Sequence, residues 1–269
     1  MRVLRDAKEK VLAEVYRFLS LNLGEPPTEF DWRYEKKKNA NGDDAAKREE
    51  EEEVKVKQER LSGLKRYTPQ GFYREFVGVD LSQFVCLYND ASQPVGKHYS
   101  FSRAHNIVGD PEMHFVNIET SAMKEIAVNS VLANQAMWFA VNMGVDQSRE
   151  HGLMEHELFD YEALFGIDMP FSKADRTRFN AGASNHAMVL TGVDLHKGKP
   201  RKWLVENSWG GDKGNKGRWT LYDKWFDEHV YTVIVNREQV PEGILSIFEE
   251  EAEMLPAWYP GAMGIRNSR

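Results

Sequence analysis

The chain has 269 residues, which is enough for one large domain or two modest ones with real cores. Its content of 41% hydrophobic and 29% charged residues is ordinary for a globular protein, and its net charge of −7 gives no global electrostatic reason to expect nucleic-acid binding. The single cysteine excludes an intrachain disulfide and suits a reducing compartment, so a cytoplasmic location is the default expectation.

No apolar run approaches the ~20 residues that a membrane helix needs, so no membrane partner is expected. The charged residues in the first ten positions leave no apolar stretch for a signal peptide, and the acidic ones among them argue against a transit peptide. A mitochondrial form of a longer precursor stays an alternative, because we expect the chain to begin within a domain.

Residues 6–23 are predicted to form an amphipathic helix, because apolar side chains recur at a spacing of three to four and Gly24 and two prolines follow. We interpret residues 1–35 as a helical segment that continues a domain begun upstream. The alternative is a free-standing N-terminal helix.

Residues 36–66 are predicted to form a charged, solvated insert. Between residues 36 and 60 nearly every side chain is charged or small, so the segment cannot bury enough apolar surface to build a core element. A partner-binding tail is the weaker alternative.

Residues 67–269 are predicted to form an α+β domain with a C-terminal tail. Helices are expected from Thr68 as N-cap, after Ser121 as cap and over residues 173–179 behind Ser172 as cap. Further elements are a short strand at 117–119, a buried strand at 136–145, strands at 186–194, 202–206, 216–222 and 231–236, and a short helix at 223–229.

His186 begins one predicted strand, and Asn207 ends the next strand along the chain. If the two strands are antiparallel neighbours, the imidazole and the amide meet at one end of the sheet. The amide then accepts from one ring nitrogen, and the other nitrogen faces a thiol. Trp209 would cover this hydrogen bond and exclude water from it.

Either feature alone has a structural explanation. A histidine on an apolar strand is often a satisfied core residue, and the run Asn207-Ser208-Trp209-Gly210 could be an ordinary exit from a strand. The joint spacing favours a catalytic His–Asn pair with Trp209 in support. The four glycines between 210 and 217 predict a loop with permissive backbone before the next strand. No metal ligand set and no cofactor site are expected.

Several segments together resemble the bleomycin hydrolase or aminopeptidase C family of papain-like cysteine peptidases, in its C-terminal portion. The segments that carry the resemblance span almost the whole chain apart from the charged insert. They are Leu23–Pro27, Phe30–Trp32, Thr68–Tyr73, Met137–Phe139, Phe159–Tyr161, Phe165–Gly166, His186–Gly192, Glu206–Gly210 and Leu255–Trp258.

The resemblance implies a papain-like fold in which helical segments precede an antiparallel sheet that bears the His/Asn pair. It also implies a thiol aminopeptidase of the cytoplasm, often a hexameric ring, that acts on peptides and on bleomycin-type amides. His186 and Asn207 match the catalytic His and Asn of the family. Nucleic-acid binding is reported for some members, and the acidic balance here gives it little support.

Two features depart from the family pattern. Cys86 lies within an apolar segment without the expected Gln and Trp neighbours, so we interpret it as a buried structural thiol and place the nucleophile outside this chain. The chain alone is then expected to be inactive. The tail after Trp258 is altered and basic, which puts the family's restriction to N-terminal residues in doubt. The second hypothesis is a non-catalytic paralogue that acts as a peptide-binding or assembly subunit.

Overall fold

A computed structural model describes residues 2–35, 61–104, 109, 111–167 and 171–260, apart from the side chain of residue 2. These residues group into two units, Met1–Asp80 and Leu81–Arg269, each described here by itself. The predicted insert falls largely on residues 36–60, which lie outside the described residues. The predicted boundaries at 35/36 and 66/67 therefore stay a prediction.

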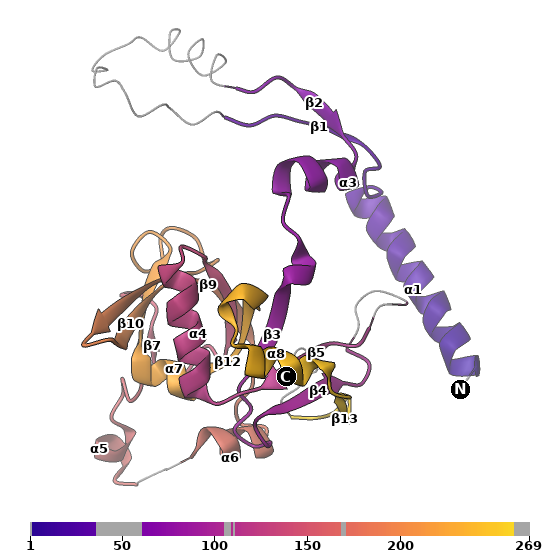
Figure 1. The fold of residues 1–269 in the computed structure, drawn as a ribbon. Helices are drawn as coiled ribbons and strands as arrows, with labels where there is room; N and C mark the ends of the chain where they lie inside the picture. Colours follow the sequence, from indigo (N-terminus) through magenta and orange to yellow (C-terminus); the bar gives the residue numbers. More distant parts are fainter. Residues whose placement is uncertain (1, 36–60, 105–108, 110, 168–170, 261–269) are drawn as a thin grey trace, which may run out of the picture. The chain divides into compact units, whose positions relative to one another are not determined.

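The first unit contains one long helix (Figure 1) and a cluster of aromatic side chains that includes Phe30, Trp32 and Phe72. Its elements are α1 (Arg2–Leu23), β1 (Phe30–Trp32), β2 (Lys65–Tyr67), α3 (Pro69–Phe72) and a π-helical turn (Tyr73–Val77). The predicted helix over 6–23 is present and ends where Gly24 adopts a φ of +84°. Thr68 caps α3 as predicted, because its hydroxyl accepts a hydrogen bond from the Gly71 N–H at 3.0 Å.

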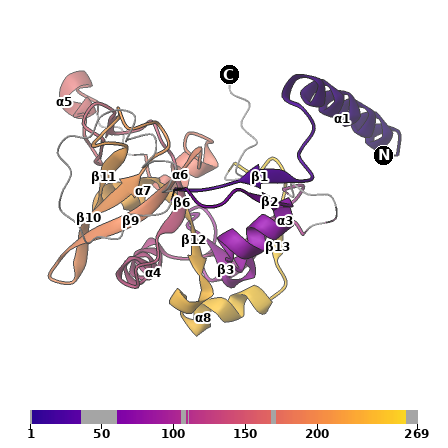
Figure 2. The same cartoon turned by 90° about the horizontal axis from the view of Figure 1, so that it is seen from above.

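The second unit is built on one sheet, which has eleven strands among the described residues. β9 and β10, the two longest of these strands, form a hairpin (Figures 1 and 2). In spatial order the strands are β13 (Glu253–Leu255), β4 (Lys97–Phe101), β5 (His114–Asn117), β3 (Phe84–Tyr88), β12 (Val230–Asn236), β6 (Met137–Val141), β9 (His186–His196), β10 (Lys199–Glu206), β11 (Arg218–Tyr222), β8 (Leu153–Met154) and β7 (Gln147–Ser148).

The second unit also contains helices. They are α4 (Thr120–Leu132), α5 (Tyr161–Phe165), α6 (Lys173–Arg178), α7 (Asp223–His229) and α8 (Glu242–Leu245), with 3-10 turns at Leu81–Gln83, Arg237–Gln239 and Ser246–Glu249. α4 packs against β6, β9 and β12, and α7 packs against β10, β11 and β12. The α+β class expected from the sequence is therefore present.

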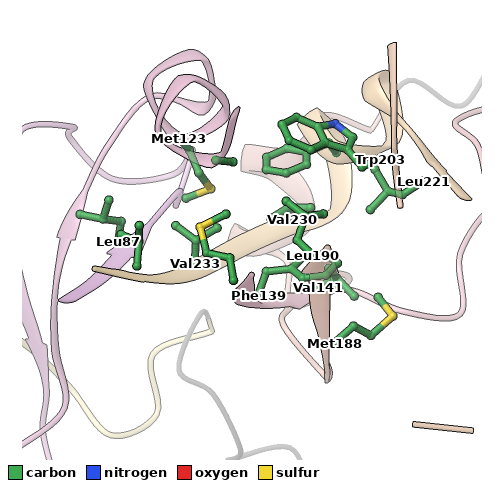
Figure 3. Close-up of a cluster of buried hydrophobic side chains, with 14 of the residues drawn as sticks. Leu87, Met123, Phe139, Val141, Met188, Leu190, Trp203, Leu221, Val230 and Val233 are labelled. Carbon is green, nitrogen blue, oxygen red and sulfur yellow. The ribbon is translucent and has the colours of Figure 1, made fainter. Parts of the chain in front are cut away.

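The core lies between one face of the sheet and these helices, as Figure 3 shows. Phe139 of β6, Met188 and Leu190 of β9, and Trp203 of β10 are almost fully buried there, together with Met123 of α4. Burying a side chain of this size contributes about 1.5–3 kcal/mol to stability. The alternation of buried and exposed residues along β10 confirms that this strand has one core face and one solvent-facing side.

Three details of the predicted elements are wrong. The strand expected at 117–119 is β5, which ends at Asn117. The N-cap position of the helix after it is Glu119, whose side chain makes no capping hydrogen bond, and Ser121 lies inside the helix. The strand expected from 216 begins at Arg218, because Lys216 and Gly217 adopt φ values of +53° and +84° that no extended strand accommodates.

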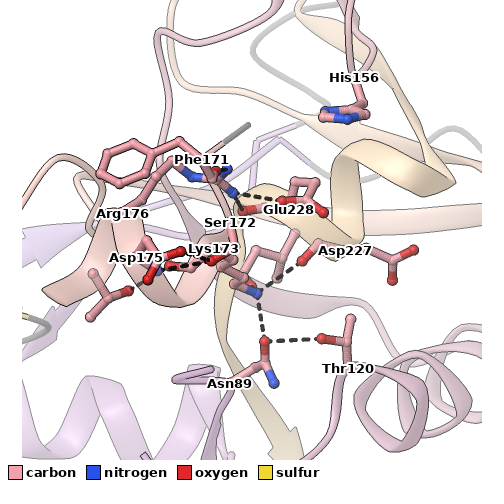
Figure 4. A network of polar contacts seen from close by, with 12 residues as sticks. Asn89, Thr120, His156, Phe171, Ser172, Lys173, Asp175, Arg176, Asp227 and Glu228 are labelled. Carbon is pink, nitrogen blue, oxygen red and sulfur yellow. Dashed lines mark hydrogen bonds and ion pairs between the residues drawn. The ribbon is translucent and has the colours of Figure 1, made fainter. Parts of the chain in front are cut away.

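A buried cation joins α6 to the sheet (Figure 4). The Lys173 ammonium donates to Asn89 Oδ1 at 2.6 Å, to the Val230 carbonyl at 2.6 Å and to the Asp227 carbonyl at 3.0 Å. Three acceptors match the three donors of an ammonium group. Burial lowers the pKa of Lys173 to about 7. Hydrogen bonds to the three acceptors offset part of the cost of removing the charged ammonium group from water.

We predict that Lys173→Met lowers the free energy of unfolding by about 1–3 kcal/mol, because the acceptors of Asn89 and Val230 lose their donor inside the protein. Urea unfolding followed by tryptophan fluorescence measures the change. The matched control is Lys224→Met, whose side chain is 67% exposed and whose effect should stay within about 0.5 kcal/mol. Equal midpoints for the two variants would contradict the stabilising role of this network.

Candidate active site

The site begins with the pairing of β9 and β10. The two strands are antiparallel, and Glu206 lies opposite Val189. This register brings the first residue of β9, His186, beside Asn207, which directly follows the end of β10. The predicted neighbourhood of the two strands is therefore present.

His186 Nε2 lies 2.8 Å from Asn207 Oδ1. An amide oxygen only accepts, so the hydrogen-bond network assigns the proton to Nε2 and leaves the lone pair on Nδ1. The Ser208 N–H also donates to Asn207 Oδ1, at 2.8 Å. Asn207 is 9% exposed, and this burial strengthens the bond relative to one in water.

Trp209 packs over this pair. Its ring centroid lies 4.9 Å from that of His186, and Trp219 holds it from the side in an edge-on contact at 5.4 Å. The Arg149 guanidinium lies 5.2 Å from the centre of the Trp209 ring, in cation–π range. The stack places apolar surface beside the His186 ring. The role predicted for Trp209, to cover the His186–Asn207 hydrogen bond, stays a prediction. Arg149 was not predicted, because nothing in its local sequence connects it to residue 209.

The backbone around His186 is braced by a neighbouring amide that the sequence analysis did not single out. Asn185 Oδ1 accepts from the Met143 N–H at 2.7 Å, and Asn185 Nδ2 donates to Asn142 Oδ1 at 3.0 Å. The Asn185 N–H donates to the Val141 carbonyl at 2.9 Å. These bonds fix the start of β9 against the end of β6, so the position of the imidazole is set by the sheet.

The glycine loop after Trp209 has the permissive backbone that its composition predicted. Gly210, Gly214 and Gly217 all adopt positive φ. A Cβ at Gly214 would lie only 2.6 Å from the Arg218 carbonyl oxygen, so the loop also requires a residue without a side chain there. The loop leads into β11, and Trp219 near the start of that strand makes an edge-on contact with Trp209.

The only cysteine of the sequence is far from this pair in the sheet. Cys86 of β3 lies opposite Ile234 of β12, which lies opposite Trp138 of β6, which lies opposite Val189 of β9. Residues directly opposite one another point to the same face of a sheet. His186 is three residues from Val189 on one strand, so the thiol and the imidazole point to opposite faces.

The surroundings of Cys86 fit a structural thiol. It lines a hollow of about 870 Å³ on its own face of the sheet, together with Trp138 and Ile234. Desolvation raises the pKa of Cys86 to about 12. A thiol with such a pKa is almost entirely protonated at neutral pH and is a poor nucleophile.

The family model and the related proteins that match this chain all indicate the same family of peptidases. The model of the Peptidase C1-like family matches residues 2–264. Aminopeptidase C of Lactococcus lactis subsp. lactis is 33% identical over 256 residues, which cover 94% of this chain and 54% of that protein. Aminopeptidase G of Lactobacillus delbrueckii subsp. lactis is 32% identical, with 95% of this chain and 54% of that protein covered.

The crystal structure of PepW from Lactobacillus rhamnosis superposes with a TM-score of 0.82 at 31% identity, covering 97% of this chain and 55% of that chain. This likeness confirms the fold expected from the sequence, the α+β arrangement of papain-like peptidases in this family. The chain spans about half the length of the relatives it matches.

We predict that iodoacetamide at pH 8 alkylates Cys86 at least about a hundredfold more slowly in the folded chain than in urea. The raised pKa removes most of the reactive thiolate from the folded state, and unfolding restores the ordinary pKa. Intact-mass spectrometry at successive times measures both rates. Similar rates in the two states would contradict the structural reading of this thiol.

Proposed function

The chain belongs to the Peptidase C1-like family, and from this membership we propose that it forms the His/Asn-bearing C-terminal part of a bleomycin-hydrolase-like cysteine aminopeptidase. The resemblance to the aminopeptidase C family found in the sequence is confirmed by the family match and by the relatives named above. The observation that carries the proposed chemistry is the 2.8 Å contact between His186 Nε2 and Asn207 Oδ1.

In this proposal His186 is first the general base and then the general acid. Its Nδ1 accepts the proton of a cysteine thiol, and the thiolate attacks the carbonyl carbon of the substrate amide. The imidazolium then gives that proton to the leaving amine, and an acyl-enzyme remains. A water molecule, deprotonated by the same nitrogen, hydrolyses the thioester and restores the thiol.

Asn207 and Trp209 act as positioning residues. Asn207 Oδ1 accepts from Nε2, which keeps the lone pair on Nδ1 in the neutral ring and supports the imidazolium when it forms. Trp209 limits access of water to this bond. The buried Nδ2 of Asn207 has no partner among the described residues. It can therefore donate a hydrogen bond to an acceptor on a further part of the enzyme.

The nucleophile comes from outside this chain in the proposal. Cys86 points to the other face of the sheet, and its environment suppresses the thiolate. A cysteine in the part of the relatives that this chain does not span would supply the thiol. The chain alone is then inactive, because binding and orientation provide only a small part of the rate of such enzymes.

The substrates we propose are peptides that carry a free N-terminus, with bleomycin-type amides as a further class. The names of the relatives, aminopeptidase C and aminopeptidase G, support peptides with a free N-terminus as substrates. A homo-oligomer, a hexameric ring by family resemblance, and a cytoplasmic location belong to the same proposal. Among the described residues, the longest helices are too short or too polar to cross a bilayer.

The second candidate function is a non-catalytic paralogue that binds peptide termini or assembles with active partners. The placement of the only cysteine on the opposite face of the sheet favours it. The two candidates differ in one respect that an assay can measure, namely whether His186 contributes to hydrolysis once a thiol is supplied.

We predict that co-expression with a complementary segment carrying the Gln and Cys of the family yields hydrolysis of aminoacyl-4-nitroanilides. His186→Ala should lower kcat by about 10³-fold or more, because the thiol loses its base and the leaving amine loses its acid. Asn207→Ala should lower kcat less, because the imidazole stays but loses its fixed tautomer. Release of 4-nitroaniline measures all rates.

The matched control is His196→Ala, at the exposed far end of the same strand, which should keep the wild-type rate. Equal rates for the wild type and for His186→Ala would remove His186 from the mechanism. A co-purified complex that binds peptides but does not cleave them would favour the paralogue.

A further inference from the structure

Three metal-ligating side chains meet on the side of the second unit that carries α7. Asp146 follows β6 and precedes β7, His156 follows β8, and His229 ends α7. One ligand atom of each lies within 4.8 Å of the others. From this arrangement we propose that Asp146, His156 and His229 form a binding site for a divalent transition-metal ion, with Zn²⁺ as the best match. The site is separate from the proposed catalytic pair.

His229 is the most informative member of this cluster. The residue is 2% exposed, and neither of its ring nitrogens has a hydrogen-bond partner among the residues that the structure describes. Buried polar atoms are normally paired, so an imidazole with two unpaired nitrogens requires an explanation. A metal ion bound to one of these nitrogens would supply a partner that the described residues do not.

His156 presents a nitrogen to the same place. Its Nε2 lies 3.3 Å from the carboxylate of Glu157, while its buried Nδ1 is without a partner in the described part of the chain. A carboxylate on one ring nitrogen fixes the proton there and leaves the lone pair of the other nitrogen for a metal. Glu157 therefore orients His156 as outer partners of metal-bound histidines do.

Asp146 completes the set with an oxygen. Its buried Oδ1 is unpartnered among the described residues. Asp146 and Glu157 also adopt φ values of +47° and +59°. Strained backbone of this kind persists where the surrounding structure holds it, and it concentrates at functional sites.

Trp225 joins two of the three segments that carry these ligands, and strand pairing holds the third. The Trp225 ring lies 4.7 Å from that of His229, and its indole N–H donates to the Val145 carbonyl at 3.1 Å. α7 is therefore fastened to the residue directly before Asp146. On the other side, Leu221 of β11 pairs with Met154, two residues before His156. The cluster is held by the sheet and does not depend on one loop.

Two imidazoles and one carboxylate are the protein ligands of many zinc sites, with water in the fourth position. Ligands about 2.0–2.1 Å from Zn²⁺ lie about 3.3 Å from one another in a tetrahedron, so the three groups need only approach by side-chain rotation. The His156 side chain is 19% exposed and gives an ion a route from solvent.

Arg176 and Lys173 contribute a positive field at His229, and the Arg176 guanidinium pairs with the Glu228 carboxylate at 2.7 Å (Figure 4). Asp146 and Glu157 add two negative charges to the cluster, and Glu157 also lies 3.8 Å from the ammonium of Lys224. The local charge therefore permits a divalent ion.

The test is a titration of the full chain with zinc sulfate by calorimetry, after removal of metals with a chelator. We expect about one equivalent of Zn²⁺ with a Kd in the micromolar range or below. His156→Ala and Asp146→Asn should each weaken binding at least tenfold, and Glu157→Gln should weaken it by about tenfold because it loosens the His156 ring. Circular dichroism checks that every variant is folded.

The matched control is His151→Ala, an exposed histidine five residues before His156, which should bind as the wild type does. Co²⁺ in place of Zn²⁺ should give visible ligand-field absorption in the wild type and in His151→Ala, but not in His156→Ala. Absence of binding by the folded wild type would overturn the proposal. The same Kd for wild type and His156→Ala would also overturn it, because the ion would then sit on other histidines.

Discussion

The alternation of side chains along paired strands decides which groups of this protein can react with one another. β6 pairs antiparallel with both β9 and β12, and the register is continuous at Phe139, Met188 and Val233. The register of each strand therefore determines which side chains of its neighbour point to the core face and which to the other face. His186 falls on the core side of this lattice and Cys86 on the other. A shift of one residue in the pairing of two of these strands would have reversed the faces on one side of that pair, and the only thiol of the chain would have faced the same way as the imidazole.

The part of the site that depends on pairing between consecutive strands was predictable from the sequence. His186 begins β9, Asn207 follows β10, and consecutive strands joined by a short turn are antiparallel neighbours. The helices behind Thr68 and Ser172 were predictable for a related reason, since a capping hydroxyl acts within three residues of its own position. In each case the determining contact is local or lies across one hairpin.

Contacts between distant segments escaped the sequence analysis. β13 pairs in parallel with β4, and more than 150 residues separate Tyr99 from Glu253. Neither strand has a strong alternating pattern, so only the tertiary pairing identifies them. The cluster of Asp146, His156 and His229 escaped for the same reason, because its ligands come from three segments whose spacing matches no familiar metal motif.

The segment from residue 142 to residue 156 connects the two sites described above. At its start Asn142 and Met143 are bonded to Asn185, the residue before His186. Near its middle Arg149 lies over Trp209. Asp146, three residues before Arg149, and His156, at the far end of the segment, each place a ligand atom within 4.8 Å of one on His229. A cation–π contact at a partly exposed position contributes only about 0.5–1 kcal/mol, which by itself would leave Arg149 free to leave the tryptophan for much of the time. The bonds to Asn185 and the backbone bond from the Glu155 N–H to the Asp146 carbonyl restrict the segment on both sides of Arg149, so less conformational entropy is lost when the guanidinium settles on the ring. The cover over the His186–Asn207 bond therefore depends on how firmly the segment is held as well as on the contact itself, and an ion bound at Asp146, His156 and His229 would hold it more firmly.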